Sequence, residues 1–209
     1  MPGPPRRGLL VDYGGVLTTN LFASFGAFCE RHGLDPAALA VAFREDREAR
    51  RALVDFECGR VDDRDFEALV AQRLGVEPDG LIDRLFGGIG PEPEMIAAVA
   101  AAKATGVRTG LLSNSWGRNS YDRTGWEDLF DATVISGEVG IRKPDPAIYA
   151  LAAERLGLPP AEVVFVDDLP HNLEPARDAG MAVVHHTEPA ATVAELERLL
   201  GVPLRTSVG

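Results

Sequence analysis

The stretch that most constrains the fold is residues 8–17, GLLVDYGGVL. Its apolar run leads directly into a carboxylate at Asp12, and two glycines follow at Gly14 and Gly15. A run of this kind is typical of a parallel strand that is buried on both faces, with Asp12 at its carboxyl end. The glycines permit a sharp turn directly after the strand. Taken alone, the stretch also fits a strand whose last aspartate only caps a turn.

The second half of the chain alternates between helix and strand patterns. The predicted strands are residues 108–113, 132–135, 163–166 and 182–185. Helices are predicted at 94–103 and 145–156, in a segment that ends near 177, and in a last segment that Thr192 and Glu195 would start as a capping box. This alternation predicts an α/β fold with a parallel sheet and right-handed crossovers.

Residues 18–90 show helical periodicity and no strand-like alternation. Helices are predicted at 22–32, 35–51, 62–74 and 78–86. The sequence GGIGPEP at residues 87–93 then forms a dense cluster of breakers. We therefore expect an all-helical insertion between the first strand and the rest of the sheet.

Composition narrows the function classes. The formal net charge is −11, and the absence of a long basic run argues against a nucleic-acid partner. Cys29 and Cys58 are far apart and lack metal-site spacing, so reduced structural thiols are expected. Residues 1–7 lack the apolar stretch of a signal peptide, and no segment reaches membrane-spanning length. We expect a cytoplasmic protein without a membrane partner, whose oligomeric state the sequence leaves open.

Polar residues end the predicted strands, where ligands of open parallel sheets bind. Ser113 and Asn114 offer a hydroxyl and amides to an anionic oxygen, although for this segment taken alone an ST-turn is the favoured interpretation. Lys143 precedes a helix start, where a cation gains nothing from the helix dipole, and this favours an anion-binding role. Asp167 and Asp168 are adjacent acids that repel each other unless a cation intervenes. Mg²⁺ fits such oxygen ligands.

Four segments fall in the order of the four motifs of the haloacid dehalogenase (HAD) superfamily. They are residues 12–17 (DYGGVL), 112–114 (LSN), 143–144 (KP) and 166–168 (VDD). The chain resembles a HAD-like hydrolase, and in particular the amino-terminal phosphatase-like domain of soluble epoxide hydrolases. The resemblance implies a Rossmann-like three-layer α/β/α core from residues 1–17 and 91–209, with a helical cap at 18–90.

The resemblance also implies roles for individual residues. Asp12 would be the nucleophile that accepts a phosphoryl group from a small phosphate ester. Ser113 and the Asn114 amide would hold the phosphoryl oxygens, and Lys143 would offset the negative charge between nucleophile and phosphoryl. The physical reason is general, because a carboxylate can attack phosphorus only where cations reduce the repulsion between two anions.

The implied Mg²⁺ site consists of Asp12, Asp168 and the backbone carbonyl of Gly14, with Asp167 supporting the site or sharing the metal. Phosphatases of the superfamily resemble one another in a second aspartate two positions after the nucleophile, which acts as general acid and base. Here that position is Gly14, which has no side chain to move a proton. Such catalysis is commonly worth about 10²–10⁴-fold, so turnover should be weak or altered. His171 is a conceivable substitute, although a solvated histidine at a helix start is the simpler interpretation.

Two functions therefore stay open at this point, and a third is less well supported. The first is a Mg²⁺-dependent phosphoester hydrolase, which the nucleophile, lysine and metal acids favour. The second is a non-catalytic protein that binds a phosphate ligand or a partner on the same scaffold. The third is a haloacid dehalogenase, which needs no leaving-group proton. Sequences of that family resemble an Asp-x-Tyr-Gly-Thr pattern that is followed by a loop with a cation. In this chain the following loop carries Thr18, Thr19 and Asn20 instead.

Overall fold

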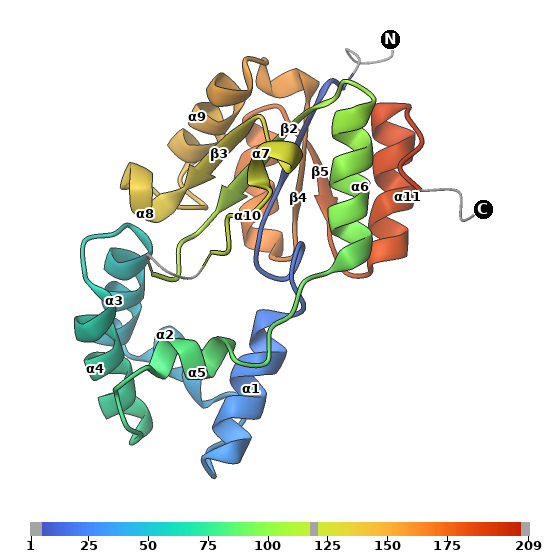
Figure 1. Cartoon of the computed structure of the whole chain (residues 1–209). Coiled ribbons are helices and arrows are strands. Elements are labelled where there is room, and N and C mark those ends of the chain that lie inside the picture. Colours follow the sequence, from blue (N-terminus) through green and yellow to red (C-terminus); the bar gives the residue numbers. More distant parts are fainter. Residues whose placement is uncertain (1–5, 118–120, 206–209) are drawn as a thin grey trace.

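A five-stranded parallel sheet in the order β3-β2-β1-β4-β5 forms the centre of the computed structural model, which describes residues 6–117 and 121–205 (Figure 1). The strands are β1 (Gly8–Val11), β2 (Arg108–Ser113), β3 (Ala132–Ile135), β4 (Val163–Asp167) and β5 (Ala182–His185). Each predicted strand is present, and β4 extends one residue further than expected. Val11 lies opposite Leu111 of β2 and Val166 of β4, so the residues that follow these strands meet at one edge.

Helices cover both faces of this sheet, as the α/β prediction required. Helices α6 (Pro93–Ala104) and α11 (Pro189–Leu200) lie on one face, and α9 (Pro146–Leu156) and α10 (Pro170–Asp178) lie on the other (Figure 1). Successive residues of β1 supply both apolar layers, because Leu9 packs with the first helix pair and Leu10 with the second. The connections carry α7 (Trp126–Leu129), α8 (Ser136–Val139) and the 3-10 helix η1 (Pro160–Glu162).

The predicted start of α11 was wrong. The helix begins at Pro189, and Thr192 lies inside it rather than at its cap. Proline suits a first helical position because its φ is fixed and its missing N–H is not needed there. The hydroxyl of Thr192 pairs instead with Nδ1 of His186 at 2.9 Å. The Thr192 side chain therefore makes a hydrogen bond to a residue outside α11, and not the capping hydrogen bond within the helix that the sequence pattern predicted.

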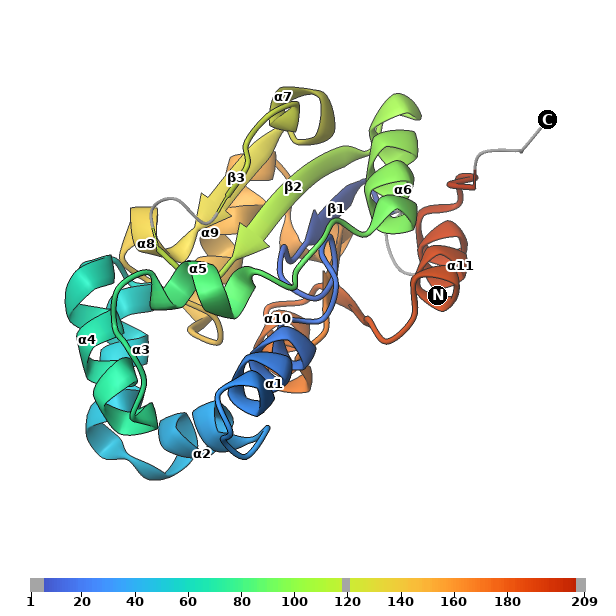
Figure 2. The ribbon, with the colours of Figure 1, turned by 60° about the horizontal axis from the view of Figure 1, so that its bottom comes forward.

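Five helices form a separate group beyond the carboxyl ends of the strands (Figures 1 and 2). They are α1 (Leu21–Arg31), α2 (Ala38–Glu45), α3 (Arg47–Glu57), α4 (Asp63–Leu74) and α5 (Leu81–Phe86). This group has its own apolar cluster, which includes Phe25, Phe28 and Phe66. Both cysteines are buried free thiols, as predicted.

The single helix predicted at residues 35–51 was wrong, because the chain breaks at Asp46. This residue adopts an extended backbone between α2 and α3. Its carboxylate accepts hydrogen bonds from the amides of Glu48 and Ala49, which is the role of an N-cap. It also pairs with Arg73 of α4 at 2.6 Å. The aspartate therefore starts a new helix where apolar periodicity alone continued the old one.

The two segments that join the helical group to the sheet run side by side. Thr18 forms an antiparallel bridge with Pro91, the Thr19 amide donates to the Gly90 carbonyl at 2.9 Å, and the Glu92 amide donates to the Leu17 carbonyl at 2.8 Å. The chain thus leaves and re-enters the sheet layer at one place. We propose the division into a core of residues 1–17 and 91–209 and a cap of 18–90 on this basis.

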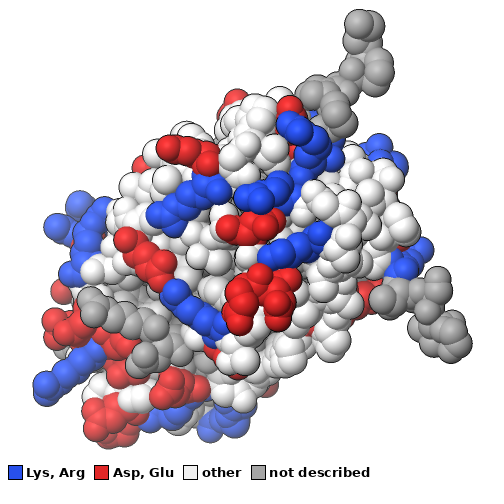
Figure 3. All heavy atoms as spheres, turned by 45° about the horizontal axis from the view of Figure 1, so that its top comes forward, with Lys and Arg blue, Asp and Glu red and all other residues white. Residues whose placement is uncertain are grey.

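The surface carries both signs of charge. On the face shown in Figure 3, basic and acidic side chains are interspersed, and the described residues there form no continuous basic surface of the kind a nucleic acid needs. Within residues 6–117 and 121–205, no helix is both long and apolar enough to cross a membrane. Residues 1–5, which enter the signal-peptide argument, lie outside the described part.

Candidate active site

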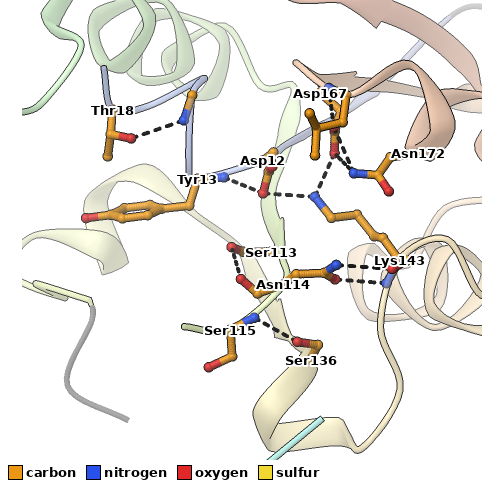
Figure 4. Close-up of polar contacts among 12 residues, drawn as sticks. Asp12, Tyr13, Thr18, Ser113, Asn114, Ser115, Ser136, Lys143, Asp167 and Asn172 are labelled. Carbon is orange, nitrogen blue, oxygen red and sulfur yellow. Dashed lines mark hydrogen bonds and ion pairs between the residues drawn. The ribbon is translucent and has the colours of Figure 1, made fainter. Parts of the chain in front are cut away.

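Asp12 follows β1 directly and lies at the carboxyl edge of the sheet (Figure 4). Its amide donates to the Val166 carbonyl of β4 at 2.9 Å, which continues the sheet register into the site. Its side chain is buried, and Oδ1 accepts from the Tyr13 amide at 2.7 Å and pairs with Lys143 Nζ at 2.9 Å. These contacts fix the orientation of the carboxylate that the family resemblance implies is the nucleophile.

Lys143 is a fully buried cation, with 1% of its surface exposed. Its Nζ bridges Asp12 at 2.9 Å and Asp167 at 2.6 Å. Burial alone would lower the pKa of Lys143, but these two carboxylates raise it above its ordinary value, so the ammonium keeps its charge. The side-chain amide of Asn114 accepts from the Lys143 amide at 2.9 Å and donates to its carbonyl at 3.1 Å. Asn114 therefore clamps the lysine backbone with its side chain, and its own backbone N–H is a donor for the expected phosphoryl contact.

Three acidic side chains converge beside this lysine. Oxygens of Asp12, Asp167 and Asp168 all lie within 4.8 Å of one another. Asp167 is completely buried, and its oxygens already accept from Leu169, Asn172 and Lys143. We therefore propose Asp167 as a supporting residue of this site. Carboxylate oxygens at this spacing suit a hard divalent cation such as Mg²⁺, so the residues present fit the implied metal.

The glycine turn after Asp12 passes close to Asp168. Gly15 has φ +74°, and a Cβ at that position would overlap the Asp168 carboxylate. Glycine is therefore required both by the left-handed backbone and by the close approach. This contact brings the backbone of residues 14–15 next to the acidic cluster, where we propose the Gly14 carbonyl as a metal ligand.

Leu21 occupies the space in which a side chain at position 14 would lie. The φ of Gly14 is not in the left-handed region, but a Cβ there would overlap Cδ1 of Leu21. Leu21 begins helix α1 of the cap and lines the same cavity as Asp12. An apolar side chain thus fills the place where related phosphatases are expected to hold an acid.

A cavity of about 1270 Å³ opens above the acidic cluster, between the sheet edge and the helical group. Ser113, Lys143 and Asp168 line its base. The remaining lining is rich in aromatic side chains, among them Phe22, Phe25, Phe43, Phe86 and Trp116. Residues 22, 25 and 28 fit a core-facing stripe by their spacing, and Phe25 and Phe28 are buried, but Phe22 is 51% exposed and faces the cavity. His171 also lines the cavity and is exposed.

Glu57 of the cap is a charged residue that sequence reasoning missed. It is 5% exposed and pairs with Arg142 of the core at 2.5 Å, next to Lys143. Its carbonyl accepts from Ser136, whose Oγ in turn accepts from the Ser115 amide at 2.8 Å. Burial raises the pKa of Glu57 to about 7, against the attraction of Arg142. These contacts tie the end of α3 to the loop that carries the lysine.

Tyr121 and Asn172 were also missed. Tyr121 contacts Ser113, and Asn172 holds both oxygens of Asp167. Asn172 lies in the first turn of α10, five positions after Asp167, and that short spacing is a signal that a search of the strand end and the following helix start would have found. Tyr121 lies in an irregular segment and Glu57 at the end of α3, and neither position shows a sequence pattern that predicts its contact.

A parallel sheet with a buried lysine and an acidic cluster at its carboxyl edge, under a helical cap, is the architecture that the resemblance to HAD-like hydrolases implied. The family model for haloacid dehalogenase-like hydrolases matches residues 7–180, and the chain belongs to this family of enzymes.

Curated relatives agree with this assignment. The chain is 38% identical over 117 residues to bifunctional epoxide hydrolase 2 of Sus scrofa, which covers 53% of the chain and 21% of that protein. It is 39% identical over 118 residues to acyl-CoA dehydrogenase family member 10 of Mus musculus, covering 56% of the chain and 11% of that protein. The chain therefore spans only a small part of these relatives. It is 29% identical to the sesquiterpene phosphatase astK of Aspergillus oryzae, covering 70% of the chain and 78% of that protein.

Solved structures share the fold. A HAD family enzyme of Bacteroides thetaiotaomicron, in complex with magnesium and inorganic phosphate, superposes with a TM-score of 0.61 at 20% identity. The match covers 87% of this chain and 94% of that one. At this identity the likeness establishes the fold alone.

Replacing Glu57 by glutamine should flatten the pH dependence of stability. The folded pKa of Glu57, about 7, lies above its ordinary value of 4.5. The stability that the protonated form contributes is therefore complete below about pH 4.5 and lost as the pH rises through 7. The parent should lose up to about 3 kcal/mol more than Glu57→Gln between pH 5 and pH 8, measured by urea unfolding without metal. Equal slopes for the two proteins would contradict this.

Mg²⁺ affinity should fall as the pH is lowered from 8 to 5. Burial and the charge of Asp167 raise the pKa of Asp168 to about 6, and burial raises that of Asp12 as well. A metal needs both groups deprotonated, so binding must release protons, and affinity should drop by roughly tenfold or more over this range. Calorimetry in two buffers of different ionisation enthalpy measures the release. Asp168→Asn should abolish binding, and an affinity independent of pH would refute the expectation.

Proposed function

We propose that this chain is a Mg²⁺-dependent phosphatase that hydrolyses a small phosphate monoester through an aspartyl-phosphate on Asp12. The observation that carries the proposal is the position of Lys143, whose ammonium lies between Asp12 and Asp167 beside the three-acid cluster. A cation held there reduces the repulsion between a carboxylate nucleophile and an incoming phosphoryl dianion.

The reaction divides into two steps. In the first, a carboxylate oxygen of Asp12 forms a bond to phosphorus while the bond to the ester oxygen breaks, and the leaving alkoxide or aryloxide takes the electron pair. Ser113 and the Asn114 backbone N–H hold the phosphoryl oxygens, and Lys143 offsets their charge. In the second step, the oxygen of a water molecule forms a bond to phosphorus while the bond between phosphorus and Asp12 breaks. The Asp12 carboxylate takes the electron pair, and the proton lost by the water passes to solvent. Bound Mg²⁺ would supply further charge compensation at the phosphoryl oxygens, held by Asp12, Asp168 and the Gly14 carbonyl.

Gly14 affects both steps. The acid that would protonate the leaving oxygen and the base that would activate water are expected to be one side chain, and this chain lacks it. Leaving groups that depart without a proton are therefore favoured, and the phosphorylated enzyme should be long-lived.

We further infer that the alcohol part of the substrate is apolar. The cavity above Asp12 is lined largely by aromatic and aliphatic side chains, and Leu21 brings this lining up to the reaction centre. Pockets of this kind take up apolar groups, and a few polar residues fix their orientation. The relative named as a sesquiterpene phosphatase supports a phosphate ester with a hydrocarbon portion.

A non-catalytic phosphate binder is the alternative, and Gly14 is the observation that favours it. A dehalogenase is less well supported. The Thr18 hydroxyl accepts a hydrogen bond from the Gly15 amide at 3.1 Å, so it stabilises the turn after Asp12. The loop that follows carries no cation near its start, because residues 18–20 are Thr-Thr-Asn.

An aryl phosphate should give a burst of product followed by slow turnover. With p-nitrophenyl phosphate and Mg²⁺, one equivalent of phenolate should appear quickly, because this leaving group needs no proton. Steady-state release should then be limited by phosphoenzyme hydrolysis, and alkyl phosphates should react about 10²–10⁴-fold more slowly in the first step. Rapid-mixing absorbance and intact-mass detection of the phosphoenzyme test this.

Asp12→Asn is the control for that experiment, and it should abolish both burst and phosphoenzyme. A steady state without a burst, equally fast for alkyl and aryl esters, would show that another proton donor exists, and His171→Gln would then identify or exclude His171. Phosphate binding without phosphoryl transfer to any ester would favour the binding protein.

Restoring the acid should require making room for it. Gly14→Asp alone requires Leu21 to shift, because the new Cβ would overlap Cδ1 of Leu21. The double variant Gly14→Asp/Leu21→Ala should hydrolyse the phosphoenzyme at least roughly tenfold faster than Leu21→Ala, which opens the same space without an acid. Single-turnover decay of the phosphoenzyme measures both. Equal decay rates in the two variants would mean that the missing acid does not limit this step.

A further inference from the structure

We propose that the Tyr121 hydroxyl orients Ser113 for donation to the phosphoryl group, which makes Tyr121 a positioning residue of this site. The inference rests on the proposed function, in which Ser113 binds a phosphoryl oxygen. Tyr121 lies eight positions after Ser113, in the segment that leaves β2, and neither the sequence motifs nor the mechanism above uses it.

The two hydroxyls and one carbonyl form a closed group. Tyr121 Oη lies 3.0 Å from Ser113 Oγ and 3.2 Å from the Asn114 carbonyl, and Ser113 Oγ lies 3.4 Å from the same carbonyl. Ser113 is buried, with 3% exposure. The Ser113 hydroxyl therefore has three possible partners: the tyrosine, the carbonyl and a ligand in the cavity.

The number of hydroxyl protons limits which hydrogen bonds Tyr121, Ser113 and the Asn114 carbonyl can make at the same time. Each hydroxyl has one proton to donate, and the carbonyl can only accept. When Tyr121 donates to the Asn114 carbonyl, Ser113 is free to donate to Tyr121 or to the same carbonyl, and in both cases its proton points away from the cavity. When Tyr121 donates to Ser113 Oγ, the serine proton is released toward a phosphoryl oxygen. The second arrangement forms a chain from Tyr121 through Ser113 to the ligand, and hydrogen bonds in such a chain strengthen one another.

The surroundings keep Tyr121 in place as a neutral donor. Its ring packs edge-on against Tyr13, with centroids 5.0 Å apart, and against Trp126 at 5.7 Å. Burial raises the pKa of Tyr121 above its ordinary value, so the phenol stays protonated at neutral pH. Ring contacts thus fix the position of the oxygen, and its proton is available to the serine.

Tyr121→Phe keeps the ring and deletes only the hydroxyl. The readout is the affinity for inorganic phosphate, measured by calorimetry at saturating Mg²⁺, together with the burst rate on p-nitrophenyl phosphate. Loss of one supporting hydrogen bond should weaken phosphate binding by about threefold to tenfold. Thermal unfolding monitors the fold of every variant.

A double-mutant cycle with Ser113→Ala separates positioning from packing. If Tyr121 acts through Ser113, the Tyr121→Phe effect should disappear in the Ser113→Ala background, because no serine proton remains to be directed. Trp126→Phe is the packing control, since it alters one of the two ring contacts and retains both the Tyr13 contact and the Tyr121 hydroxyl. It should not reproduce the loss of phosphate affinity.

The outcomes are distinct. Additive effects in the cycle, an unchanged affinity in Tyr121→Phe, or an equal loss in Trp126→Phe would each overturn the role of Tyr121 while the parent still binds phosphate. A parent that neither binds phosphate nor forms a phosphoenzyme would overturn the proposed function, and this inference with it.

Discussion

The buried ammonium of Lys143 between Asp12 and Asp167 is the interaction on which the rest of the site depends. Three carboxylates lie within 4.8 Å of one another, and a single buried lysine stands among them. When all are ionised, two negative charges remain uncompensated in a poorly solvated place. The raised pKa of Asp168 expresses this imbalance, since burial and the charge of Asp167 both favour its protonated form. A divalent cation carries the missing charge, which is the physical basis for proposing Mg²⁺ here.

The sheet and its loops hold this lysine from several directions. Asn114 after β2 clamps the lysine backbone, and Asp167 at the end of β4 fixes the ammonium, itself held by Asn172 of α10. Each of these residues reaches the site because parallel strands end together. Glu57 adds a contact from the cap, through Arg142 beside the lysine. With Asp12 after β1, the position of one ammonium group thus depends on three strands, a core helix and a cap helix.

The sequence predicted what local patterns determine. Apolar runs located the strands, and the polar residues that end them, Asp12, Ser113 and Asp167, meet at one edge because strand order requires it. Predictions failed where a side chain found a tertiary partner. Asp46 splits a helix while pairing with Arg73, and Thr192 bonds His186 instead of capping α11. Glu57 was missed because its partners Arg142 and Ser136 are distant in sequence, and Tyr121 because its contact with Ser113 crosses an irregular segment that no periodicity describes.

Gly14 and Leu21 are best understood together. An aspartate at position 14 would need space and hydration beside Asp12, and Leu21 occupies that space with an apolar side chain. Leu21 thereby extends the apolar lining of the cavity to the nucleophile. On the proposed function, the site loses acid and base catalysis and gains contact area for a hydrocarbon group close to the phosphorus. Binding energy from that group can be used to position the ester for attack, and this is the form of catalysis left to a phosphatase that lacks the second acid.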